Sequence, residues 1–73
     1  MEKNFTDEEI ECRFSYHSPK NDQGERYELI RRECGKLARL IIKNSPASRE
    51  QSLALTKLDE VCFWTNASIA RRE

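Results

Sequence analysis

The sequence is poor in the residues that build turns. It contains two glycines and two prolines among 73 residues. A sheet of many strands needs a turn between successive strands, and glycine and proline supply many of the turn conformations. Their scarcity therefore favours an all-α fold over an all-β fold.

The chain has no excess charge of either sign and no long apolar run. Thirteen Lys and Arg residues balance thirteen Asp and Glu residues, so no overall positive field would hold a DNA or RNA backbone. No apolar run approaches the roughly 20 residues that span a bilayer. The first five residues also lack the apolar stretch of a signal peptide. We therefore expect a soluble cytosolic protein that binds no nucleic-acid polymer and no membrane.

Catalytic and metal-binding residues are equally scarce. His17 is the single histidine, and Cys12, Cys34 and Cys62 form no CxxC pair. One imidazole, with no nucleophile elbow and no phosphate-binding glycine loop, leaves the common catalytic sites incomplete and supplies too few ligands for zinc. An odd number of cysteines without a secretory signal predicts free thiols, with Cys34 and Cys62 as small core residues. The sequence predicts a protein that is not an enzyme and holds no metal or other cofactor.

The chain is short for a stable monomer. A single domain of this length rarely gains more than roughly 3–5 kcal/mol from its core, so it needs a disulfide, a metal, very regular helix packing or association. Its hydrophobic residues, at 37%, barely outnumber its charged residues, at 36%. Because a disulfide and a metal are both unsupported, we expect the chain to associate with copies of itself.

Three capping signals predict three helices. Each helix begins at a polar N-cap with Glu or Gln three residues later, and the pairs are Thr6 with Glu9, Asp22 with Glu25, and Ser48 with Gln51. The predicted helices cover residues of about 6–14, 22–44 and 48–72, within one domain of residues 1–73.

The two longer segments each carry an apolar stripe. Successive members are three or four residues apart, and the stripes are Tyr27, Ile30, Cys34, Leu37 and Ile41, and Leu55, Leu58, Cys62, Thr65 and Ile69. Two such helices joined by a short loop fold back on one another. The predicted fold is all-α, with a short N-terminal helix followed by a long antiparallel helical hairpin.

Further apolar residues lie outside these stripes. Leu29 and Leu40 share one line on the middle helix, and Leu53 and Trp64 share one line on the last helix. A single hairpin cannot bury both faces of each helix. The short first helix, with Phe5, Ile10 and Phe14, could cover one of them. We predict that the other face, formed by the four residues of these lines, is a homo-oligomeric interface.

Aromatic and cationic residues suited to anion recognition cluster around the first loop. They are Tyr16 and His17 in the loop, and Arg26, Arg31 and Arg32 on the following helix. A stacking ring and guanidinium groups are what a nucleotide base and its phosphates require. The same arginines also suit the solvated face of a charged helix, and Arg71 and Arg72 suit the negative end of a helix dipole.

Several segments together resemble a known family. They are Tyr16-His17-Ser18-Pro19 leading into Arg26-Tyr27-Glu28-Leu29-Ile30-Arg31, then Ser48-Arg49-Glu50-Gln51-Ser52-Leu53-Ala54, Thr56-Lys57-Leu58-Asp59-Glu60, and Trp64-Thr65-Asn66-Ala67-Ser68-Ile69-Ala70-Arg71. The chain resembles the helical-hairpin family of phage anti-defence sponges over residues 16–72. This family includes anti-CBASS proteins and a hairpin shared with some anti-Thoeris proteins.

The resemblance implies a non-catalytic protein encoded by a phage or prophage and present in the cytoplasm of the infected bacterium. Such proteins bind the cyclic oligonucleotide messengers of bacterial immunity and keep them from their effectors. The resemblance implies a homo-hexamer that holds cyclic dinucleotides between neighbouring protomers. Some members of the family have a separate pocket for cyclic trinucleotides.

The resemblance also implies roles for individual residues. Tyr16 would stack on a base and Arg31 would meet a phosphate. His17 and Arg26 would make secondary contacts, or would order the loop. Arg71 or Arg72 would serve the trinucleotide pocket.

Two other functions fit the residue pattern less well. Trp64 and the outer leucines could dock the chain onto a host protein, which would make it a protein-interaction module. A regulator of duplex DNA needs a basic recognition helix, but the last helix combines Lys57 with Asp59 and Glu60. The sequence thus favours the sponge, with the interaction module as the alternative.

Overall fold

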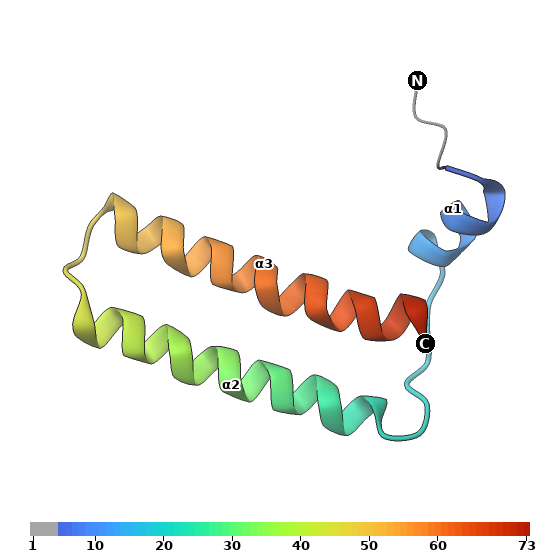
Figure 1. Ribbon diagram of the computed structural model, residues 1–73, viewed down its shortest axis with the longest axis horizontal. Helices are drawn as coiled ribbons and strands as arrows, with labels where there is room; N and C mark the ends of the chain where they lie inside the picture. The colour runs from blue at the N-terminus through green and yellow to red at the C-terminus, as the bar shows by residue number, and fades with distance from the viewer. Residues whose placement is uncertain (1–4) are drawn as a thin grey trace.

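The structure is a computed structural model, and it describes residues 5–73 as three helices and their connections. The helices are α1 (Asp7–Phe14), α2 (Gln23–Asn44) and α3 (Arg49–Arg72). Figure 1 shows α2 and α3 side by side and antiparallel, with α1 beside the C-terminal end of α3. The predicted helical architecture is confirmed, and no strand occurs within residues 5–73. The single domain that the sequence predicts also includes residues 1–4, which lie outside the described residues.

Two of the three predicted N-caps form their side-chain hydrogen bond. The Thr6 hydroxyl accepts a hydrogen bond from the Glu9 backbone N–H, and the Ser48 hydroxyl accepts one from the Gln51 backbone N–H, each at 3.1 Å. Both caps have the extended backbone that this geometry requires. In neither capping box does the second hydrogen bond form, from the N-cap backbone N–H to the side chain three residues later. The Glu9 side chain binds Arg13 and Arg72 instead, and the Gln51 side chain binds Ser45.

Asp22 is the N-cap residue of α2, as predicted, but the predicted capping hydrogen bond of its side chain does not form. The Asp22 backbone has φ −92° and ψ 12° rather than an extended conformation, and its side chain makes no capping hydrogen bond. Its carboxylate instead accepts from Arg26 Nε at 3.1 Å. Asn21, with a φ of 53°, turns the chain into the helix, and Gln23 Oε1 accepts from the Lys20 backbone N–H at 2.9 Å. Gln23 therefore fixes the entry to α2, and it is the one residue of 5–73 that is buried, at 4% exposure.

Polar contacts close the hairpin at both ends. At the loop end, the Gln51 amide donates to the Ser45 carbonyl and hydroxyl oxygens, each at 3.0 Å. At the open end, the Arg26 guanidinium donates to both carboxylate oxygens of Glu73, at 2.6 and 2.8 Å. The hydrogen bonds to Arg26 lower the pKa of Glu73 to about 2. These contacts fix the alignment of α2 against α3.

The hairpin encloses very little apolar surface. Most members of the two predicted stripes are half-buried, and no apolar side chain of residues 5–73 is fully buried. Cys34 and Cys62 are free, half-buried thiols on facing helices, and burial together with a hydrogen bond to Cys62 raises the pKa of Cys34. The first helix does not cover the second apolar face, because Phe14 is 83% exposed and Ile10 and Phe5 are also exposed.

Candidate functional site

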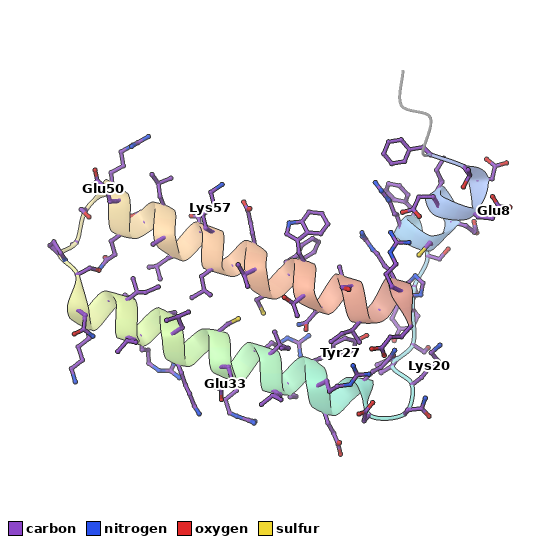
Figure 2. The ribbon with its side chains drawn as sticks, viewed as in Figure 1. Glu8, Lys20, Tyr27, Glu33, Glu50 and Lys57 are labelled. Carbon is purple, nitrogen blue, oxygen red and sulfur yellow. The ribbon has the colours of Figure 1, made fainter. Side chains whose placement is uncertain are left out.

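A cleft of about 600 Å³ opens where the α1–α2 connection meets the two long helices. The connection contributes Tyr16 and His17, α2 contributes Arg31, and the C-terminal half of α3 contributes Arg71. Four of the six ligand-binding residues predicted from the sequence therefore line one cleft. Tyr27 also lines it and lies between α2 and α3 near the open end of the hairpin (Figure 2).

The connection holds its two aromatic residues in different ways. His17 Nε2 donates to the Cys12 carbonyl oxygen at 2.7 Å, so the imidazole anchors the connection to the end of α1. The Tyr16 ring is 85% exposed at the cleft. An anchored backbone carrying an exposed ring is suited to stacking on a flat ligand, because only the two side-chain torsions of the ring remain to be ordered on binding.

Three arginines line the cleft, and two of them, Arg31 and Arg71, are only weakly engaged by the protein, whereas Arg13 is paired with Glu9. The Arg31 guanidinium lies 3.5 Å from Glu28, the upper limit of a hydrogen bond, and both side chains are largely exposed. Arg71 lies in the last turn of α3, where its backbone carbonyl accepts from the Cys12 thiol at 3.3 Å. Its side chain makes no ion pair within residues 5–73. Both guanidinium groups are thus available to an anionic ligand.

The remaining two predicted residues lie outside this cleft. Arg26 is held by Glu73 and Asp22 at the open end of the hairpin. Arg72 lines a second cleft of about 310 Å³ together with Arg71, Trp64 and Arg13.

Glu9 neutralises Arg72 in the second cleft. The Arg72 guanidinium donates to the two Glu9 oxygens at 2.8 and 3.1 Å, and Arg13 donates to the same carboxylate. These hydrogen bonds, that of Arg72 first, lower the pKa of Glu9 to about 2. The ion pairs attach α1 to the end of α3.

The sequence of the hairpin matches a known protein family. The family model of the Acb2/Tad1 hairpin domain matches residues 6–70. The chain belongs to the Acb2/Tad1 hairpin family. The resemblance to anti-CBASS and anti-Thoeris sponges is thereby confirmed. Searches of curated proteins and of solved structures gave no match.

The cleft of this Acb2/Tad1 hairpin also contains residues that the sequence did not single out as site residues. Asp59, Phe63 and Asn66 line it from α3, at spacings of four and three residues that place them on one helix face. Asp59 is exposed and borders the cleft. Only the position of α3 relative to the first connection identifies this face as part of a site.

The four predicted interface residues of the hairpin are all exposed in the single chain. They are Leu29, Leu40, Leu53 and Trp64, and Trp64 is the most exposed at 58%. The Trp64 ring also meets the exposed Phe63 ring edge to face, with centroids 4.9 Å apart. Within residues 5–73, no helix is long and apolar enough to cross a membrane, and no three His, Cys, Asp or Glu side chains cluster as metal ligands would.

Proposed function

We propose that this hairpin binds cyclic oligonucleotide messengers of bacterial immunity and sequesters them without chemical change. In this role it acts for a phage in the cytoplasm of the infected bacterium and prevents the activation of CBASS effectors. The observation that carries the proposal is the cleft that the exposed Tyr16 ring lines together with the weakly held Arg31 and with Arg71, which is unpaired within residues 5–73. Membership of the Acb2/Tad1 hairpin family supports it.

The cleft suits such a ligand in size and charge. Its volume of about 600 Å³ is typical of a small-molecule site. A cyclic dinucleotide has two bases and two phosphates related by near two-fold symmetry. A site shared by two antiparallel copies of the chain would present Tyr16 and Arg31 to each half of the ring. Tyr16 would stack on a base, and Arg31 would bind a phosphate through a guanidinium fork.

The other predicted residues take supporting roles in this proposal. His17 orders the connection that carries Tyr16, and Arg26 fixes the end of the hairpin through Glu73. The second cleft, with Arg71 and Arg72, is the proposed position for a cyclic trinucleotide. A ligand there would compete with Glu9 for Arg72.

The proposed assembly is a homo-oligomer, and the family resemblance points to a hexamer. The chain exposes 6045 Å². A compact monomer of its mass, 8.6 kDa, exposes about 4,700 Å². The excess of more than about 1,000 Å² exceeds the roughly 800 Å² that one partner buries in a standard interface. This supports at least one contact surface of standard size on each chain, with the exposed leucines and Trp64 as central residues.

Titration calorimetry with cyclic dinucleotides, cyclic trinucleotides and cyclic ADP-ribose isomers tests the proposal. We expect Tyr16→Ala to abolish binding of cyclic dinucleotides and to leave the assembly unchanged, whereas Tyr16→Phe retains the stacking ring and binds. Native mass spectrometry of the same samples reports the assembly and any bound ring together. A correctly assembled protein that gives no heat with any of these compounds would refute the sponge.

A second candidate function rests on the exposed Phe63 and Trp64 rings. These rings could dock onto a host protein instead of another copy of the chain. A host protein that is retained by Tyr16→Ala and lost by Trp64→Ala in pull-down experiments would favour this interaction module.

A further inference from the structure

The cleft contains a carboxylate, that of Asp59, although the proposed ligand is an anion. Asp59 lines it alongside Arg31, and the Asp59 side chain takes part in none of the hydrogen bonds or ion pairs formed within residues 5–73. A free carboxylate repels a phosphate, so it weakens a site that recognises phosphates alone. It favours a ligand that places hydrogen-bond donors at this position.

Among the common bases, guanine matches a carboxylate best. Its Watson–Crick edge carries two adjacent donors, the N1–H and the 2-amino group, and a carboxylate accepts both in parallel. Adenine presents its acceptor N1 beside the 6-amino group, which would place a lone pair against a carboxylate oxygen. We infer that Asp59 reads the guanine edge, so that the cleft prefers cyclic dinucleotides that contain guanine. This inference rests on the proposed function.

The surroundings of Asp59 suit a base. Phe63 lies one helical turn further along α3 and is 56% exposed, so its ring offers a flat apolar surface beside the carboxylate. Asn66 follows on the same face, about 10 Å from Asp59 along the helix axis. Its Oδ1 is buried and has no hydrogen-bond partner within residues 5–73. Asp59 is thus the exposed acceptor on this face that the described part of the chain leaves unsatisfied.

The distribution of charge in the cleft is consistent with a ligand whose phosphates lie at the arginines and whose guanine edge lies at Asp59. Arg31 and Arg71 supply the positive charge for phosphates, and Asp59 supplies a negative charge on the helix that faces Arg31. A nucleotide has the matching asymmetry, because its phosphate is an anion and the guanine edge is a donor. In a two-fold site each copy would contribute one Asp59, so both bases of the ring would be read.

The test compares three rings on the full chain by calorimetry: cyclic di-GMP, cyclic di-AMP and cyclic di-IMP. Hypoxanthine, the base of IMP, retains the N1–H and lacks the 2-amino group. We expect the wild-type protein to bind cyclic di-GMP roughly tenfold to hundredfold more tightly than cyclic di-AMP, with cyclic di-IMP between them. Asp59→Asn should remove the preference for guanine and should bind cyclic di-AMP at least as tightly as the wild type does.

Glu60→Gln is the matched control. It removes the same charge at the adjacent position, where Glu60 faces Lys57 at 4.0 Å outside the cleft. It should keep the guanine preference. Because Asp59 is exposed, Asp59→Asn should fold and assemble normally, which circular dichroism and native mass spectrometry check.

Two failures can be told apart in this experiment. Equal affinity of the wild type for cyclic di-GMP and cyclic di-AMP, or a guanine preference that survives Asp59→Asn, overturns the role of Asp59 and leaves the sponge intact. A wild-type protein that binds none of the rings overturns the proposed function and this inference with it.

Discussion

Truncation of Trp64 should dissociate the proposed assembly. Trp64 is 58% exposed in the single chain. A fully covered tryptophan buries roughly 225 Å², so about 130 Å² of this side chain is left exposed, and its burial is worth about 3 kcal/mol at 25 cal/mol per Å². Trp64→Ala should therefore weaken each contact that it makes by roughly a hundredfold.

Sedimentation velocity across a dilution series measures this effect. The wild type should remain assembled at concentrations where Trp64→Ala has separated into smaller species. Phe14→Ala is the matched control, because Phe14 is 83% exposed on α1 and belongs to neither predicted interface line. Identical sedimentation of the wild type and Trp64→Ala would refute the interface reasoning. Dissociation by Phe14→Ala alone would place the interface on α1.

Three further predictions concern the ligand, the ion pairs and a helix cap. Arg31→Ala should weaken binding of a cyclic dinucleotide by roughly tenfold to a hundredfold, and Arg31→Lys by less, as calorimetry would show; unchanged affinity would remove Arg31 from the site. The depressed pKa values of Glu9 and Glu73, each about 2, imply stabilisation that is complete above the ordinary value of 4.5 and lost as the pH falls through about 2. Carboxyl NMR titrations should give midpoints near 2, and ordinary midpoints would show that these pairs do not persist in solution. Ser48→Ala should cost about 1 kcal/mol of stability in urea unfolding, because it removes the cap of α3, and Ser52→Ala, on the exposed surface of the same helix, should cost much less.

The sequence was sufficient to predict features that depend on neighbouring residues. Thr6 and Ser48 were identifiable as caps because each bonds to a backbone N–H three residues away. The same rule failed at Asp22, because Asn21 and the contacts of Gln23 set the backbone there and Arg26 takes the carboxylate. Capping rules consider only the helix itself, whereas the entry to α2 is determined by the preceding connection.

The composition of the cleft was only partly predictable. Tyr16 and Arg31 were identifiable by residue type and by resemblance. Asp59 and Asn66 had no distinguishing local signal, because their importance arises from the connection that packs near α3. Long-range pairs such as Arg72 with Glu9, which are 63 residues apart, likewise depend on how the hairpin and α1 meet. The sequence therefore predicted the helices well, and the neighbours of each side chain across the fold poorly.

In the proposed assembly, the absence of a fully buried apolar residue within residues 5–73 would link the survival of the protein to its dosage. A polypeptide whose apolar burial comes mainly from neighbouring copies gains its stability by mass action, so sparse chains unfold and are degraded before they meet. We therefore expect protection in the cell to rise more steeply than linearly with expression level. Rapid synthesis early in infection would then matter as much as the affinity of each site.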